Sequence, residues 1–200
     1  MNKHFSDTGS EPFLSEQQRM VRNTARQLGR DVLAPTAAER DSTSAWPTEE
    51  LRVLGAQGFM GMTVSEEYGG SGLGLTEASV IMEEINRAGG NSGACHGQMY
   101  NMNTLVRHGS EEQRQRYLPR IASGELRLQS MGVTEPTTGT DTTKIKTTAV
   151  KRGDRWVING QKVWISRIQH SDFMILLART TPLADVKKKS EGLSIFMVDL

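Results

Sequence analysis

Apolar residues recur at helical spacing over the first part of the chain. Between residues 15 and 122 they return every three or four positions, the period of a helix that buries one face. Ser15 and Gln18 have the spacing of a capping box, and Pro35 is expected to end the helix that follows. The apolar face of this first helix consists of Val21, Ala25, Leu28 and Val32.

Three further segments carry the same helical signature. Pro47 fits the first position of a helix that Gly58 closes, and the glycine pair 89–90 ends another. Ser110 and Gln113 repeat the capping pattern before a last helix. The apolar face ahead of the glycine pair is Ala78, Ile81, Met82, Ile85 and Ala88. Because each face needs a partner to bury it, these helices predict a bundle.

The last third of the chain is patterned as strands. The segment TTAVKRGDRWVINGQKVWIS (147–166) holds β-branched and aromatic runs that are separated by turn signals at 152–154 and at 159–160. Two hairpin turns so close together predict an antiparallel meander, since Asn-Gly tolerates positive φ at both turn positions. FMILLAR (173–179) and LSIFMVDL (193–200) are expected to extend this sheet.

The change of period predicts the domain organisation. We expect an α+β protein, with an all-α helical bundle over residues 1–125 and an antiparallel β-barrel or sheet domain over residues 126–200, incomplete at its C-terminus. The chain contains no internal repeat and no low-complexity tract.

Composition and charge exclude several function classes. Lys and Arg number 24 against 23 Asp and Glu, and a net charge of +1 offers no field that would attract nucleic acid. The single cysteine excludes an internal disulfide, and the four scattered histidines lack metal-ligand spacing, so no metal is expected. No run has the length of a membrane span or signal peptide, which makes the cytoplasm the expected location.

One stretch near the expected domain boundary has an unusual composition. MGVTEPTTGTD (131–141) contains four threonines, a proline and two glycines, which can direct hydroxyls and backbone N–H groups at a polar or phosphorylated ligand. Clefts often lie between domains, so the position suits a binding site. Taken alone, the stretch is better explained as a threonine-rich turn between strands.

A second motif changes that interpretation. About twenty residues later the chain reads NGQKVWIS (159–166), and this pair of motifs resembles the flavin-binding signature of the acyl-CoA dehydrogenase family. EEYGGSGLGLTEA (66–78) and HGSEEQRQRYLPRIASGE (108–125) also resemble that family's helical domain, in the same order. The resemblance covers nearly the whole chain and implies an enzyme in which FAD and an acyl-CoA thioester are enclosed by helical and β domains.

The resemblance also implies which residues bind the cofactor. Thr134 would lie near the isoalloxazine, Ser166 would reach flavin N5, and Thr140 would meet both FAD and the CoA part of the substrate. The complete set of implied FAD-binding residues is Met131, Val133, Thr134, Gly139, Thr140, Trp164, Ile165 and Ser166.

The sequence departs from the family pattern at several of these positions. Thr140 replaces the usual serine, which keeps the hydroxyl and adds a methyl group. Thr137 and Thr138 stand where Gly-Ala is common and stiffen the loop at χ1. Arg167 follows Ser166 where the family has asparagine, and the pattern gives no physical reason for a charged, bulky side chain there.

The implied reaction removes an α-proton from the thioester and transfers the β-hydride to the flavin. It needs oriented hydrogen-bond donors and a carboxylate base. In this family the base lies in the C-terminal helical domain, which places it after Leu200, so no catalytic residue is expected in this chain and turnover by the chain alone is not expected. Glu135 belongs to the turn on the FAD side and is predicted to be structural.

Other features suggest ligands but have simpler explanations. GGSGLG (69–74) lacks a preceding strand, so a helix-entry loop is favoured over a dinucleotide site. Cys95 and His96 are adjacent in sequence, whereas a catalytic pair must be opposed in space, so a helix wall is favoured. In the resemblance this stretch lies near the acyl pocket, where Met99, Tyr100 and Met102 would either shape the pocket or belong to the core.

The function predicted from these motifs is oxidation of an acyl-CoA to the 2,3-enoyl-CoA, with electron-transfer flavoprotein as the acceptor and a homodimer or homotetramer as the assembly. Two alternatives stay open. One is an acyl-CoA oxidase or flavin monooxygenase of the same fold. The other is a non-catalytic module that binds flavin or an acyl group.

Overall fold

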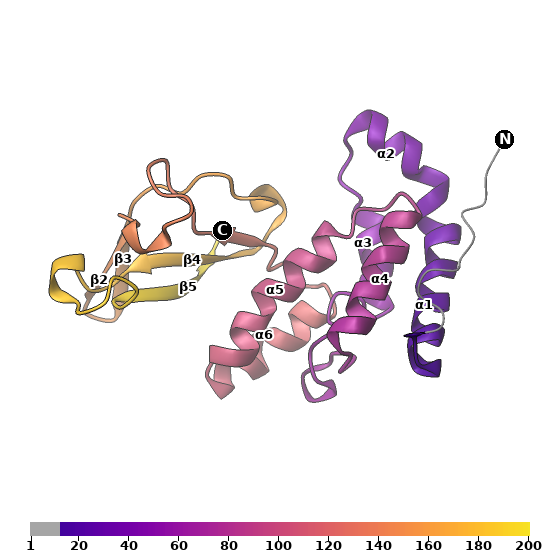
Figure 1. The fold of residues 1–200 in the computed structure, drawn as a ribbon, viewed down its shortest axis with the longest axis horizontal. Helices are drawn as coiled ribbons and strands as arrows, with labels where there is room; N and C mark the ends of the chain where they lie inside the picture. The colour runs from indigo at the N-terminus through magenta and orange to yellow at the C-terminus, as the bar shows by residue number, and fades with distance from the viewer. Residues whose placement is uncertain (1–12) are drawn as a thin grey trace.

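The computed structural model describes residues 13–200, in which the helices come first and the strands follow. The helices are α1 (Glu16–Leu28), α2 (Ala37–Thr43), α3 (Thr48–Ala56), α4 (Leu75–Arg87), α5 (Gly93–His108) and α6 (Glu111–Ala122). The strands are β1 (Ser130–Gly132), β2 (Thr148–Arg152), β3 (Arg155–Asn159), β4 (Phe173–Arg179) and β5 (Leu193–Asp199). The two groups lie side by side, with α5 and α6 nearest the sheet (Figure 1). This arrangement confirms the predicted α+β class.

The predicted capping boxes set two helix starts. The Ser15 hydroxyl accepts from the Gln18 amide at 3.2 Å, and the Gln18 side chain accepts from the Ser15 amide at 2.9 Å. Ser110 and Gln113 make the same reciprocal pair at the start of α6. Each pair satisfies two amide groups that have no partner within the helix, so local sequence alone fixes these two ends.

Between α1 and α2 the chain stays helical but changes its period. Gly29–Leu33 forms a π turn and Ala34–Thr36 a 3-10 turn. A Cβ added at Gly29 would come within 2.7 Å of the Ala88 Cβ, so this turn approaches α4 closely because it carries a glycine. The prediction that Pro35 ends the first helix was wrong, since α1 ends before the π turn and Pro35 lies in the 3-10 turn.

The segment before α4 is the helix-entry loop that the sequence favoured. Gly69 and Gly72 have φ of 76° and 60°, and Gly74 is the N-cap of α4. The helix after Pro47 begins one residue later than predicted, because Pro47 is the N-cap of α3 and Thr48 its first residue. This difference from the prediction is small and local.

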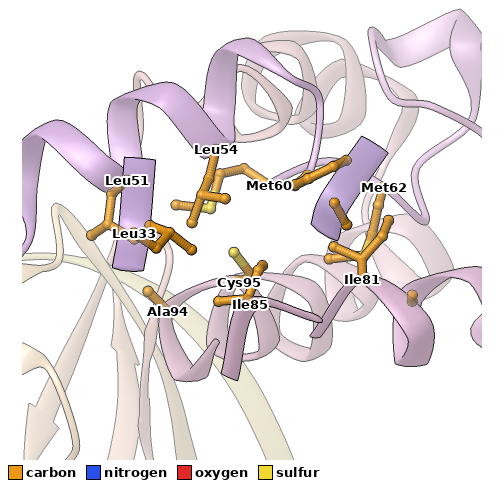
Figure 2. Close-up of a cluster of buried hydrophobic side chains, with 12 residues drawn as sticks. Leu33, Leu51, Leu54, Met60, Met62, Ile81, Ile85, Ala94 and Cys95 are labelled. Carbon is orange, nitrogen blue, oxygen red and sulfur yellow. The ribbon is translucent and has the colours of Figure 1, made fainter. Parts of the chain in front are cut away.

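A first core fills the space among α1, α3, α4 and the start of α5. Met62, Ile81 and Ile85 are completely buried, and Leu54 nearly so. Figure 2 shows these side chains pointing toward one another from opposite elements, with the sulfur of Cys95 among them. Truncating one of these aliphatic side chains to alanine would cost about 2–5 kcal/mol.

A second core joins the helices to the sheet. Met102, Leu118 and Ile121 come from α5 and α6, and they pack with Leu128 and with Ile175 of β4. All five side chains are buried. The helical part and the sheet therefore share apolar contacts, which fixes how the sheet is placed against α5.

The sheet is mixed rather than an antiparallel meander. β4 pairs in parallel with β1, where Ser130 lies opposite Met174, and with β2, where Thr148 lies opposite Arg179. β5 pairs antiparallel along the other edge of β4. The prediction of antiparallel strands was correct for β2 with β3 and for β4 with β5. It was wrong for β1 and for the link from β2 to β4, because turn signals report only pairs that are adjacent in sequence.

Only one of the two predicted hairpin turns forms. Arg152 pairs with Arg155 across Gly153, whose φ is 64°, as a two-residue turn requires. At the second signal neither Asn159 nor Gly160 has positive φ, and β3 ends there. The chain instead passes close to Thr147. A Cβ built on Gly160 would lie 2.3 Å from the Thr147 hydroxyl oxygen, so only a glycine fits there.

Candidate functional site

The two sequence motifs meet at one place. After β3 the chain turns toward the loop that follows β1, and the Val163 amide donates to the Thr134 carbonyl at 3.0 Å. The Ser130 hydroxyl donates to the Ser166 carbonyl at 3.3 Å and lies 2.6 Å from the Ser171 hydroxyl. These contacts hold the segment 160–171 beside the threonine-rich loop.

This junction presents a flat aromatic ring and free hydroxyls on its surface. Trp164 is 88% exposed and has φ of 61°, a left-handed backbone that a tryptophan rarely adopts. Within residues 13–200 the hydroxyls of Thr134, Thr140 and Ser166 make no hydrogen bond, and Thr140 and Ser166 are exposed. A planar heteroaromatic ligand can pack on the indole and accept hydrogen bonds from these hydroxyls. The residues present therefore fit a flavin.

The other residues predicted to bind the cofactor lie in the same loop and segment and differ in burial. Met131 and Val133 are partly buried, and the Val133 carbonyl accepts from the Lys162 ammonium at 2.9 Å. Ile165 is partly buried, whereas Gly139 is exposed with open space around it. The loop and the segment are adjacent, and which of these residues contacts a cofactor stays a prediction.

Glu135 lies beneath the loop in a closed set of hydrogen bonds. Its carboxylate accepts from the amides of Lys146 (2.6 Å) and Thr147 (2.9 Å) and from the Lys162 ammonium (3.0 Å). The side chains of Glu135 and Lys162 are only 4% and 5% exposed. Burial by itself would raise the pKa of Glu135, but the donors around the carboxylate outweigh it and lower that pKa to about 2. A carboxylate so held is a structural anion and a poor base.

The threonine-rich loop is closed by its own backbone. Glu135 and Thr138 exchange two amide-to-carbonyl bonds of 2.9 and 3.1 Å, and Thr138 is buried. Asp141 then accepts from the amide and hydroxyl of Thr143 and pairs with Lys144 at 3.2 Å, which lowers the pKa of its carboxyl. Thr138 and Asp141 therefore shape the loop, which leaves the exposed Thr140 for a ligand.

Cys95 and His96 do not form a reactive pair. Cys95 is completely buried in the first core, and burial raises its pKa to about 12, which keeps the thiol protonated. His96 is exposed on the other side of α5, where its ring packs edge-on against Tyr100 at 5.1 Å. The structure confirms that this stretch is a helix wall.

The methionines of α5 belong to the two cores and also line a cavity. Met102 is completely buried in the second core, and Met99 packs against the first. Both, with Tyr100, also line a cavity of about 420 Å³, whose wall includes Leu73 and Val106. Whether Met99, Tyr100 and Met102 shape an acyl pocket stays a prediction.

No sequence motif assigns a role to Arg167. Its backbone is left-handed, with φ of 61°, and its guanidinium crosses to α5, where Nη2 lies 3.4 Å from the Tyr100 hydroxyl. Three residues further on, the His170 ring stacks on Trp46 with 3.9 Å between ring centroids. The segment that departs from the family pattern is thus the one that reaches the helical part.

Two further properties hold for the part of the chain that the structure describes. Residues 13–200 contain no helix with the length and apolar character needed to cross a membrane. They also contain no group of three His, Cys, Asp or Glu side chains arranged to hold a metal ion.

Comparison with known proteins gives consistent matches. The model of the acyl-CoA dehydrogenase N-terminal domain matches residues 15–125, and that of the middle domain matches residues 130–200. The chain is 39% identical over 190 residues to the mitochondrial isovaleryl-CoA dehydrogenase of Pongo abelii, covering 93% of this chain and 44% of the relative.

Solved structures show the same likeness. An acyl-CoA dehydrogenase from Geobacillus kaustophilus superposes with a TM-score of 0.84 at 31% identity, covering 94% of this chain and 49% of the other. A chain from the structure described as "Electron transferring flavoprotein of Acidaminococcus fermentans" gives 0.83 at 32% identity, covering 94% and 48%. The chain thus spans less than half the length of these relatives.

Proposed function

Because the chain belongs to the acyl-CoA dehydrogenase family, we propose that the junction of its two motifs binds FAD and that the protein oxidises an acyl-CoA thioester at Cα–Cβ. The observation that carries the proposal is Trp164, an exposed indole with a strained backbone beside unbonded hydroxyls. Backbone strain persists only where the surrounding structure enforces it, and it is concentrated at ligand sites.

The proposed roles follow from the position of each side chain. The face of Trp164 packs on the flavin ring, Ser166 and Thr134 donate to its polar edge, and Thr140 donates to the cofactor and to the CoA part of the substrate. Met131, Val133, Gly139 and Ile165 complete the wall. When bound, FAD supplies the hydride acceptor that no protein side chain can provide.

The proton-abstracting base is proposed to come from a residue after Leu200. Glu135 does not suit this role, since three donor groups fix its carboxylate under the loop and lower its pKa. A base must approach the proton that it removes to within hydrogen-bond distance. Residues 1–200 alone are therefore expected to bind the cofactor but not to dehydrogenate a thioester.

Several further properties of the protein are proposed as well. We infer domains at 1–125 and 126–200, a homodimer or homotetramer, and electron-transfer flavoprotein as the acceptor, an inference supported by the description of one similar structure. The cytoplasm stays the predicted location, although the isovaleryl-CoA relative is described as mitochondrial. Oxidase or monooxygenase activity would be distinguished by peroxide formation in air, and a non-catalytic module by flavin that no thioester bleaches.

FAD binding provides the direct test. Trp164→Ala in the complete protein is expected to weaken FAD binding about three- to tenfold, since ring packing contributes roughly 0.5–1.5 kcal/mol beyond burial. Flavin fluorescence during titration measures this change. Trp156→Ala is the matched control, because Trp156 is also an exposed tryptophan but lies in β3, away from the junction. Equal dissociation constants for the two variants would remove Trp164 from the cofactor site.

A further inference from the structure

The Arg167 side chain lies flat on a glycine surface of α5. Atoms of its guanidinium would stand only 2.6–3.0 Å from a Cβ built on Gly97, and Nη1 would stand 3.4 Å from one built on Gly93. These glycines are four residues apart and therefore share one face of the helix. The helix thus provides space for this arginine, which a side chain at Gly97 would displace.

The guanidinium has no compensating negative charge. Within residues 13–200 it forms no ion pair, and its only hydrogen bonds are long, from Nη2 to the Tyr100 hydroxyl (3.4 Å) and to the Gln129 carbonyl (3.5 Å). Nε is inaccessible to solvent and has no partner. Removing a charged group from water without a partner is unfavourable, so such a site favours an added anion.

Among the described residues Arg179 also lacks a carboxylate partner, but its environment differs from that of Arg167. Its guanidinium is buried, and it donates to four carbonyl groups at 2.7–3.4 Å, which belong to Thr143, Thr181, Lys189 and Glu191. Backbone oxygens thus surround its charge. Arg167 has one such carbonyl, at the limit of hydrogen-bond distance.

Arg167 also forms part of the wall of a cavity of about 370 Å³. The remaining wall comes from α2, the loop 44–47, the turn 89–91 and Ala94 of α5. Nη1 makes no hydrogen bond yet is not buried, which leaves it available to a ligand. The first turn of α5 adds the positive end of its helix dipole to the same cavity.

The other charged residues of the cavity do not neutralise Arg167. Arg40 pairs with Glu50 at 2.8 Å, and both side chains are largely buried, so its charge is already compensated. Asp41 is exposed and forms no ion pair within the described residues. The one uncompensated anion of this wall therefore lies at the rim, open to solvent.

We propose that this cavity binds a carboxylate at the far end of the acyl group of the thioester, with Arg167 as the residue that selects it. The inference rests on the proposed function and deepens it, because it names the substrate class as an acyl-CoA with a terminal carboxylate. Arg167 directly follows Ser166, the residue proposed to face the flavin, so one segment contacts both the reacting end and the distal end of the acyl group.

Binding of two thioesters of equal carbon number tests the proposal. Calorimetry on the complete FAD-loaded protein compares glutaryl-CoA with pentanoyl-CoA, and the wild type is expected to bind glutaryl-CoA more tightly by about tenfold to a hundredfold, as for a hydrogen bond to a charged group. Arg167→Gln should abolish this preference, and Arg167→Lys should keep part of it. Asp41→Asn should tighten glutaryl-CoA binding by about two- to fivefold.

Arg30→Gln is the matched control, because Arg30 is exposed and forms no ion pair within the described residues. A wild type without preference between the thioesters, or a preference that survives in Arg167→Gln, would overturn the proposal. Because affinity is measured, the result does not depend on turnover. Flavin bleached equally by both thioesters would leave the proposed function intact and reject the carboxylate site.

A titration with free glutarate tests whether the cavity binds a free dicarboxylate instead of the carboxylate of a thioester. It is titrated into residues 1–200 without flavin, and shifts of the Ala94 amide resonance report occupancy. Weak binding that Arg167→Gln removes, together with preference for glutaryl-CoA, supports the proposal. Glutarate binding without any thioester preference overturns it, since the cavity would then take a free dicarboxylate. The circular dichroism of each variant shows whether it folds.

Discussion

Two cations on one short segment have opposite environments. Lys162 donates to the Glu135 carboxylate at 3.0 Å and to the Val133 carbonyl at 2.9 Å, and both members of the ion pair are buried. Arg167 lies five residues later, and among the described residues its guanidinium has no ion pair and only two long hydrogen bonds. A compensated charge stabilises the fold, whereas an uncompensated charge beside a cavity is available to a ligand.

The two cations also differ in how they relate to the family motif. Lys162 fits the family motif, and its charge is neutralised inside the protein. Arg167 departs from the motif, and residues 13–200 provide no anion for it. Substitutions at these two positions should therefore affect different properties: stability in the first case and binding in the second.

The largest effect is expected from Lys162→Met. It would leave the Glu135 carboxylate buried without its cation, and breaking a buried pair in this way costs about 3–5 kcal/mol of unfolding free energy. Urea unfolding measures the loss. Arg52→Met is the control, because its pair with Glu49 is exposed, and about 1 kcal/mol or less is expected there. Similar losses in both variants would contradict the structural role of the buried pair.

Acid should remove the same stabilisation. The pKa of Glu135 falls from its ordinary value of 4.5 to about 2 in the folded chain, so its contribution is fully present above pH 4.5 and is lost as the pH falls toward 2. Unfolding free energy should therefore decrease over this interval. In Glu135→Gln this part of the decrease should be absent. An identical pH dependence in the variant would show that other carboxyl groups account for the loss.

The smallest effect on stability is expected from Arg167→Met. Because the guanidinium has no ion pair to lose, its replacement by an apolar side chain should change the unfolding free energy by about 1 kcal/mol or less, in either direction. The same urea experiment measures it. A loss comparable with that of Lys162→Met would mean that Arg167 is structural, and the contrast between the two cations would disappear.

Local signals in the sequence predicted what depends on neighbours along the chain. Ser15 and Ser110 cap helices through residues three positions away, and the turn at Gly153 joins adjacent strands. The apolar runs of β4 and β5 were located for the same reason, since their length and branched side chains suffice. The paired motifs likewise identified the loop and the segment that lie together at the candidate site.

Features that depend on distant contacts were not predicted. Asn159-Gly160 carries a hairpin signal, but the close approach to Thr147 and the burial of Lys162 direct the chain elsewhere. The position of Arg167 on Gly97 joins residues seventy positions apart, which no local pattern reports. The only sequence feature that pointed to a special role for Arg167 was its charge, in a position where the family has a neutral amide.

The central place of β4 has a consequence for how the chain folds during synthesis. β1 pairs with β4 in parallel, so its partner is made more than forty residues after it. Until β4 has left the ribosome, Leu118 and Ile121 lack the cover that Ile175 later provides. Non-local pairing of this kind is slow and leaves apolar surface open. The interval between translation of β1 and that of β4 therefore leaves apolar surface that a chaperone can bind.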